Sequence, residues 1–463
     1  MISNYNSEFK RRMGGPERVL LMMPLNVVMV AKIKGSVDVE RLASVLDSLR
    51  KRHALLAVRV VMDENDIAWY VSEDVPEFTI DTIPRQAEDQ WLQIAVDECK
   101  TSFPIETGPL VRFSLLHSPE RSDLVVCAHH AICDGMSLTF LIRDILQQLA
   151  APEQEVEILP EPAAITRDTG PSPPPTNFIA RGVIGLFNKL WARQNIRFNS
   201  NDLERLHRVF WEKNRDAGVL AWESSVAETK ALVSRCRAEN VTVNTALWTA
   251  FLAAQYEVQS DAEPYRASAG LAVSTRDKLT VPVGEAFGFY ASSLTAHLEY
   301  DSRQTFWDSA RIIHEKIGDS LAKTNIFRSL SAELLAPTLL DSLYFSKYGL
   351  IKSRLSDKLV RQMNWRGTSY GYSITNVGRM NIPTTYGQYQ LESVYGPFVY
   401  SDVNEKTIGV ITVGDKVTFL MSYNKAIVTP HTAEAIRDTA MDYLSNAINQ
   451  YAEITPLNTT FGV

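Results

Sequence analysis

The segment from residue 123 to residue 135 holds the side chains of this sequence that are best suited to acid–base chemistry. It reads Asp-Leu-Val-Val-Cys-Ala-His-His-Ala-Ile-Cys-Asp-Gly and places the adjacent histidines His129 and His130 just before Asp134 and Gly135. An imidazole has an ordinary pKa of about 6.5, so a histidine can accept a proton near neutral pH. The segment therefore predicts a general base.

Adjacent residues of a strand point to opposite faces, so only one of the two histidines can face a given site. The other is available for a structural hydrogen bond. Gly135 can let a substrate approach the backbone closely, and its N–H can stabilise a developing oxyanion. Asp134 lies four residues after His130, so it either orients the imidazole or pairs with an arginine elsewhere and holds the turn.

Three other interpretations compete with a general base. The histidine pair could be purely structural. His129, His130 and Asp134 could also bind a metal ion, but adjacent strand residues diverge and no further His/Cys cluster lies nearby. Cys133 could be a nucleophile, although nothing around it indicates a lowered pKa.

The elements around this segment alternate between helical and strand patterns, which predicts a mixed α/β fold. The predicted strands cover residues 25–34, 55–62, 69–72, 110–116, 124–130, 224–234, 268–274, 294–298, 373–376, 409–413 and 416–423. The predicted helices cover residues 38–52, 86–99, 137–149, 233–239, 244–255, 305–323 and 431–450.

A proline-rich stretch marks the clearest boundary in the chain. Residues 152–175 contain seven prolines, a density that excludes both helix and central strand. We therefore predict an N-terminal domain over residues 1–151, a linker and crossover over 152–216, and a C-terminal domain over 217–463. The amphipathic segment 178–215 is expected to pack across the junction.

The composition is that of a globular protein, with 463 residues, 45% hydrophobic and 22% charged, and a net charge of −7. Nucleic-acid binders usually carry a basic surface, so we expect no nucleic-acid partner. The four cysteines form no CxxC pair and predict free, mostly buried thiols in a reducing compartment. They are Cys99, Cys127, Cys133 and Cys236.

No segment predicts a signal peptide or a membrane span. The first six residues lack a charged region followed by an apolar core. Pro24 and Asn26 interrupt the apolar run 19–31, which is also shorter than the ~20 residues a span requires. We expect a buried strand there and a cytoplasmic protein.

The string HHAICDG matches the HHxxxDG motif of the condensation-domain and chloramphenicol-acetyltransferase-like superfamily. This group includes condensation domains of peptide synthetases, polyketide-associated acyltransferases, wax ester synthases and alcohol acetyltransferases. Other segments resemble the same proteins along nearly the whole chain, namely residues 52–56, 103–112, 238–248, 273–276, 287–289 and 373–378.

The resemblance implies two chloramphenicol-acetyltransferase-like α/β sandwich domains arranged as a V, with a channel between them. His130 would face the channel as the general base, and His129 would be structural. Asp134 would pair with an arginine, for which Arg276 is the candidate, and Gly135 would line the site. The residues that would contact the acyl carbonyl or the pantetheine arm are Ser373, Thr375 and Asn376.

The implied reaction moves an acyl group from a thioester, either acyl-coenzyme A or an acyl carrier protein, to a hydroxyl of a small-molecule or lipid acceptor. The alternative is an amide-forming condensation enzyme that uses carrier-bound substrates, and a third is a non-catalytic binding module. The thioester would be a co-substrate, and no permanently bound cofactor and no metal are expected. A free-standing monomer is expected.

Two departures narrow the resemblance. The DFGWG motif of plant BAHD acyltransferases is absent, with only a faint echo at residues 394–398, and the PLWLGG start of wax ester synthases is missing. The sequence is therefore more similar to the polyketide-associated, alcohol acetyltransferase and stand-alone condensation types. Residues 347–366 hold six basic side chains against one acid, which favours either binding of coenzyme A phosphates or an acidic carrier, or a solvated helix face.

Overall fold

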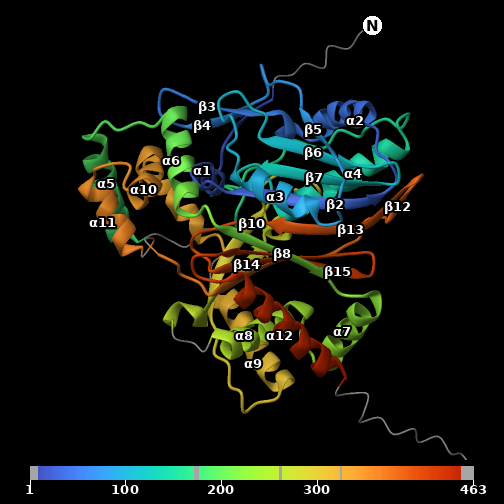
Figure 1. The fold of residues 1–463 in the computed structure, drawn as a ribbon. Helices are drawn as coiled ribbons and strands as arrows, with labels where there is room; N and C mark the ends of the chain where they lie inside the picture. The colour runs from blue at the N-terminus through green and yellow to red at the C-terminus, as the bar shows by residue number, and fades with distance from the viewer. Residues whose placement is uncertain are drawn as a thin grey trace, which may run out of the picture.

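The computed structural model describes residues 9–171, 177–259, 263–323, 326–363, 365 and 367–449. These residues form two lobes, each built on a six-stranded sheet, and a small three-stranded sheet at one edge (Figure 1). The prediction of a mixed α/β fold with two lobes is therefore confirmed. The first six residues, which are predicted not to form a signal peptide, lie outside the described residues.

The N-terminal lobe is built on a sheet of strand order β12-β13-β2-β7-β6-β5. Its central strands read as almost unbroken apolar runs because helices and loops cover both faces. The strands are β2 (Asn26–Lys34), β5 (Ile80–Pro84), β6 (Val111–His117), β7 (Arg121–His129), β12 (Thr385–Tyr386) and β13 (Tyr389–Phe398). Its helices are α1 (Gly15–Leu21), α2 (Val39–Arg52), α3 (Gln90–Lys100) and α4 (Gly135–Ala150). The small sheet is β1 (Lys10–Arg12), β3 (Arg59–Met62) and β4 (Ala68–Val71).

The C-terminal lobe is built on a sheet of strand order β10-β9-β11-β14-β15-β8, with helices on one face (Figure 1). The strands are β8 (Ala217–Glu223), β9 (Ser268–Ser274), β10 (Ala291–His297), β11 (Tyr372–Met380), β14 (Lys406–Val413) and β15 (Lys416–Asn424). The helices are α7 (Val226–Ala238), α8 (Val243–Gln259), α9 (Phe306–Lys323) and α12 (Pro430–Asn449).

A strand from late in the chain crosses into the N-terminal lobe. β13 pairs antiparallel with β2, while β11 before it and β14 after it belong to the C-terminal sheet. The proposed boundaries after residues 151 and 216 stay a prediction. Residues 389–398 lie within the predicted C-terminal domain, but they form β13 and complete the N-terminal sheet.

Two predicted elements were wrong. Residues 224–234, predicted as a strand, lie mostly in helix α7, and the strand β8 ends just before them. Ser225 and Glu228 form a capping box, in which each side chain accepts a hydrogen bond from the other residue's backbone N–H, and this starts the helix. The first half of the predicted strand 55–62 is a short 3₁₀ helix (Ala54–Ala57).

Four helices form a separate cluster beside both sheets (Figure 1). They are α5 (Phe178–Ala192), α6 (Ser200–Lys213), α10 (Pro337–Lys347) and α11 (Arg354–Gln362). α5 is fastened beside the start of α10, since Asn188 Nδ2 donates to the Leu334 carbonyl at 2.8 Å and Trp191 Nε1 donates to Thr338 Oγ1 at 2.9 Å. The prolines at positions 173–175 lie outside the described residues.

The four cysteines are unpaired and buried, as the sequence predicts. Among the residues that the structure describes, no helix combines the length and the apolarity needed to cross a membrane.

Candidate active site

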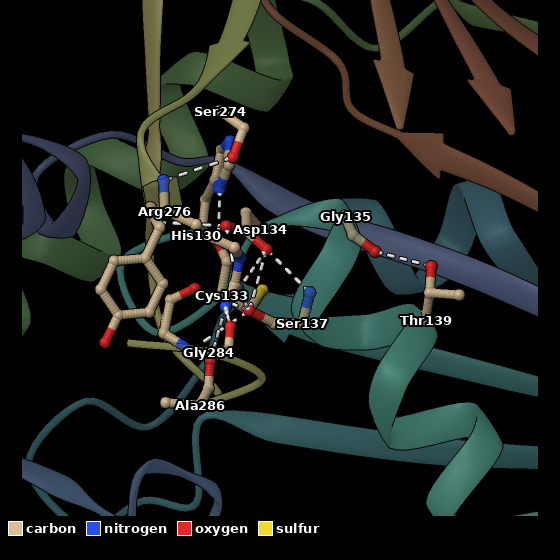
Figure 2. A network of polar contacts seen from close by, with 12 residues as sticks. His130, Cys133, Asp134, Gly135, Ser137, Thr139, Ser274, Arg276, Gly284 and Ala286 are labelled. Carbon is tan, nitrogen blue, oxygen red and sulfur yellow. Dashed lines mark hydrogen bonds and ion pairs between the residues drawn. The ribbon is translucent and has the colours of Figure 1, made fainter. Parts of the chain in front are cut away.

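The turn between β7 and α4 holds the His-His-x-x-x-Asp-Gly segment (Figure 2). His129 is the last residue of β7, and His130 follows it with its backbone N–H donating to the Leu25 carbonyl at 3.0 Å. The Tyr70 hydroxyl donates to the Ala131 carbonyl at 2.8 Å from the small sheet. The turn is therefore held from several sides.

His130 has one ring nitrogen engaged by the backbone. Its Nδ1 lies 2.9 Å from the Cys133 carbonyl, which can only accept, so Nδ1 carries the proton and Nε2 keeps a free lone pair. The ring lies edge-to-face against Phe289 of the C-terminal lobe, with centroids 5.3 Å apart. Burial lowers the pKa of His130 below its ordinary value, although the Cys133 carbonyl and the Asp134 charge act in the opposite direction. The result is a neutral imidazole that can accept a proton through Nε2.

His129 takes different partners. Its Nδ1 accepts the Ala131 backbone N–H at 3.2 Å, and its ring lies edge-to-face against Phe103 at 6.1 Å. Burial, together with the nearby His130 and His207, lowers the pKa of His129 to about 3. This histidine stays neutral and shapes the turn through its own backbone hydrogen bond.

Asp134 is the N-cap of α4. Its Oδ1 accepts the Ser137 backbone N–H at 2.7 Å, and its Oδ2 accepts the Tyr290 backbone N–H at 3.1 Å. Arg276 Nη2 donates to the two carboxylate oxygens at 3.0 and 3.2 Å (Figure 2). The sequence left two roles open for Asp134, orienting the His130 imidazole or pairing with an arginine. The contacts in the structure are those of the second role, together with a cap at the start of α4.

Arg276 joins this turn to the C-terminal lobe. Its Nη1 donates to the Gly284 and Ala286 carbonyls at 3.0 Å each, and its Nη2 also donates to Ser137 Oγ at 2.7 Å. The guanidinium lies over the Tyr290 ring, 4.7 Å from its centroid. The structure thus pairs Asp134 with the arginine named from the sequence, and the effect of this pair on activity stays a prediction.

The sequence interpretation missed three contributors to this site, Ser137, Phe289 and Tyr290. Ser137 follows Asp134 by three residues, the spacing of a capping contact, so its role was readable locally. Phe289 belongs to the segment 287–289 that resembles the family, but it was given no place at the turn. It and Tyr290 come from a loop more than 150 residues away in the sequence, and no local pattern links them to the turn.

Gly135 lies where three elements meet. A Cβ atom there would be 2.6 Å from Pro397 Cγ on β13 and 2.9 Å from Val377 Cγ2 on β11, closer than van der Waals contact allows. The glycine is required by close packing at the junction of the lobes, because α4 could not otherwise approach both strands.

We expect Gly135→Ala to lower the free energy of unfolding by about 1–3 kcal/mol, since an extra methyl group overpacks this junction. Urea denaturation of the purified protein measures the change. Gly182→Ala in α5 is the matched control, because no atom lies within 4 Å of an added Cβ there and alanine favours helix. Equal effects of the two substitutions would contradict the packing argument.

The three residues predicted to contact substrate lie on β11 and are half-buried. Tyr372 and Ile374 pack into the core of the C-terminal lobe, so Ser373 and Thr375 lie on the opposite face of the sheet. Ser373 Oγ donates to the Gly270 carbonyl at 2.8 Å. Their contact with substrate stays a prediction.

Asn376 is engaged within its own lobe as well. Its Nδ2 donates to Asn244 Oδ1 at 3.3 Å, and its Oδ1 accepts the Gly378 N–H at 2.8 Å. A break in the register of β11 and β14 lies between Asn376 and Gly378. The amide therefore has a local role in shaping this irregular end of the strand.

The structure also bears on two alternatives to a general base, namely Cys133 as a nucleophile and a metal site. Cys133 is fully buried, and burial raises the pKa of its thiol well above the ordinary value, so the thiol stays protonated and is a poor nucleophile. Within the described ranges, no group of three or more His, Cys, Asp or Glu side chains is arranged to hold a metal ion.

The Arg-His segment at residues 52–53 ends α2 and fastens it to α4. His53 Nε2 lies 2.9 Å from Asp144 Oδ2, and Arg52 Nε donates to the same oxygen at 2.7 Å. Arg143 binds Asp144 and reaches Glu285 in the loop that precedes Phe289. His53 thus has a structural role.

Comparison with known proteins gives a family match to the N-terminal part of the chain. Residues 24–162 match the family model of the condensation domain. Nonribosomal peptide synthetase 5 of Gibberella zeae is 28% identical over 144 residues, which cover 30% of this chain and 1% of that protein. The match therefore spans a very small part of this much longer relative.

Solved structures match over nearly the whole chain. The trichothecene 15-O-acetyltransferase of Fusarium sporotrichioides superposes with a TM-score of 0.65 at 12% identity, covering 95% of this chain and 96% of that chain. The first condensation domain of the calcium-dependent antibiotic synthetase, in complex with a substrate analogue, gives a TM-score of 0.63 at 12% identity, with coverage of 95% and 96%. The resemblance drawn from the HHxxxDG motif is thus confirmed: residues 24–162 match the condensation domain, and the chain has the two-lobed fold shared by condensation domains and chloramphenicol-acetyltransferase-like acyltransferases.

Proposed function

We propose that this protein is an acyltransferase that moves an acyl group from a thioester to a hydroxyl acceptor, with His130 as the general base. The observation that carries the proposal is the hydrogen bond from His130 Nδ1 to the Cys133 carbonyl, which leaves Nε2 as a proton acceptor. The condensation-domain match supports a transferase in the wider sense.

In the proposed reaction, His130 Nε2 takes the acceptor's hydroxyl proton as its oxygen attacks the thioester carbonyl. The tetrahedral intermediate then collapses, the carbon–sulfur bond breaks, and the departing thiolate takes the proton back from the imidazolium. Backbone N–H groups at the start of α4 near Gly135, and the Thr375 hydroxyl, are the proposed oxyanion donors. No acyl-enzyme is required if both substrates bind together.

An amide-forming condensation is the second candidate, because the family match and the first curated relative are of the peptide-synthetase kind. The O-acetyltransferase among the structural neighbours favours the ester. The same base serves both reactions, and they differ in the acceptor, an alcohol or an amine.

The donor is proposed to be acyl-coenzyme A or a carrier-bound phosphopantetheine thioester. Of the basic residues predicted to meet such a donor, Lys347 already pairs with Asp402 at 2.8 Å. Arg354, Lys358 and Arg361 are exposed on α11, while Arg366 lies outside the described residues. This exposed set is compatible with the solvated helix face that was the alternative interpretation.

Acceptor-dependent thiol release tests the proposal. The purified protein is incubated with acyl-coenzyme A donors of graded length, or with an acylated carrier protein, and with pools of alcohols or amines. Release that requires an alcohol, with the ester seen by mass spectrometry, supports the first candidate. Release that requires an amine selects the second, and no release with any donor and acceptor would overturn both.

The lowered pKa of His130 has a consequence for the pH profile. A base acts in its neutral form, and burial keeps the imidazole neutral to lower pH than in water. We therefore expect the acid limb of kcat/KM to have its inflection below about pH 6.5, the ordinary imidazole value. A stopped-time assay across buffered pH measures it, and an inflection above that value would contradict the burial argument.

A further inference from the structure

Helix α5 presents apolar side chains to solvent. Phe178 is 83% exposed and Ile179 is 62% exposed. Of the twelve large hydrophobic side chains that are exposed among the described residues, five lie on this one helix of 15 residues. They are Phe178, Ile179, Val183, Leu186 and Leu190. A concentration of this kind on one element marks an interaction surface.

Four of these residues form a continuous stripe. Ile179 is followed by residues four, seven and eleven positions later, a spacing that places side chains on one face of a helix. The name apolar stripe is used below for Ile179, Val183, Leu186 and Leu190.

The outward direction of the apolar stripe is determined by contacts on the opposite face. Asn188 Nδ2 donates to the Leu334 carbonyl and its Oδ1 accepts the Ala336 N–H, both at 2.8 Å. Trp191 is buried beside them. On the outer side, Gly182 and Gly185 have no heavy atom within 4 Å of an added Cβ. The helix is therefore docked by its inner face and stands clear of the protein on its outer face.

The charge around the apolar stripe is one-sided. Residues 177–199 contain four basic residues and no acidic residue, although the whole chain has a net charge of −7. The four are Arg181, Lys189, Arg193 and Arg197, of which Arg197 lies beyond the end of α5 and pairs with Asp66 at 3.5 Å. α11 lies in the same helix cluster (Figure 1) and carries exposed Arg354, Lys358 and Arg361. A surface with apolar side chains among cations complements a layer of anionic headgroups above acyl chains.

We propose that α5 is a membrane-surface anchor that lies flat on a bilayer containing anionic lipids, with the apolar stripe inserted below the headgroups. The helix is about 22 Å long at 1.5 Å per residue, and such helices insert to a depth of about 5–10 Å. A second copy of the chain is a poorer occupant, because its own cations at residues 181, 189 and 193 would meet the same cations across the interface.

Vesicle co-sedimentation of the full chain tests the proposal. The probes are vesicles of phosphatidylcholine mixed with phosphatidylglycerol, and vesicles of phosphatidylcholine alone. We expect the wild type to bind the mixed vesicles and to lose binding as salt is raised, since screening weakens the attraction to anionic lipid. Ile179→Asp should reduce binding at least about tenfold, because an isoleucine side chain that the proposal places inside the bilayer is replaced by a charge.

Ile158→Asp is the matched control, since Ile158 is also 62% exposed but lies in the linker before α5. It should bind vesicles like the wild type. Neither position is in the proposed active site, so thiol release from soluble substrates should be unchanged in both variants, which separates this proposal from the proposed function.

Two results would overturn the anchor. One is the absence of vesicle binding by the wild type at low salt. The other is equal loss of binding in Ile179→Asp and Ile158→Asp. If the wild type self-associates in size-exclusion chromatography, does not bind vesicles, and becomes monomeric in Ile179→Asp, the apolar stripe is a face between copies of this chain, and the membrane assignment is wrong.

Discussion

Replacing His130 with alanine should lower the rate of acyl transfer by about 10²–10⁴, the usual contribution of a general base. The variant loses the Nε2 lone pair that accepts the proton beside Phe289. The fold should be kept, because the imidazole makes a single hydrogen bond to the turn, from Nδ1 to the Cys133 carbonyl. Acceptor-dependent thiol release measures the rate, and circular dichroism with thermal unfolding checks that the fold is kept.

His431→Ala is the matched control for His130→Ala, because His431 is exposed at the start of α12. It should leave the rate unchanged. A folded His130→Ala protein with wild-type turnover would show that proton transfer takes place elsewhere, and the proposed mechanism would have to be abandoned.

Replacing Arg276 with leucine should lower the free energy of unfolding by about 3–5 kcal/mol, because the buried Asp134 carboxylate would lose its charged partner. The variant also loses the bonds to the Gly284 and Ala286 carbonyls, which hold the loop that carries Phe289. The rate of acyl transfer should fall with stability. Urea denaturation and the thiol assay measure the two effects.

The exposed pair Arg303–Asp301 serves as the control for this prediction. Its ion pair is 2.8 Å long, similar to the Arg276–Asp134 contact, but Arg303 is almost fully exposed. Arg303→Leu should leave the free energy of unfolding nearly unchanged, since solvent screens such pairs.

Arg276→Lys should rescue only part of the loss, because one ammonium cannot serve the carboxylate and two carbonyls together. A full rescue by lysine would reduce the role of Arg276 to its charge.

Local patterns predicted much of the site. The apolar strand that leads to the two histidines and the apolar helix after Gly135 follow from residues close in sequence, and the structure has both. The N-cap at Asp134 was not predicted, although its partner Ser137 lies only three residues later. The pairing of Asp134 with Arg276 came from the resemblance to a family, since nothing local connects residues 142 positions apart.

Long-range packing accounts for what the sequence did not predict. Residues 389–398 were not recognised as a strand, because Gly396 and Pro397 interrupt the pattern that β-strands usually show. The amphipathic pattern of residues 178–215 predicted that this segment packs across the junction, but the pattern does not tell which face turns inward. The inward face is set by the hydrogen bonds of Asn188 and Trp191 to Leu334 and Thr338, which are distant in the sequence.

The crossing of β13 has a consequence for how the protein is made. On the ribosome the chain emerges from its N-terminus, and the N-terminal sheet lacks its neighbour to β2 until residue 398 has been synthesised. Until then β2 is an open sheet edge, and Gly135 has neither Val377 nor Pro397 to pack against. The active-site turn is therefore completed late in translation, after most of the chain has left the ribosome.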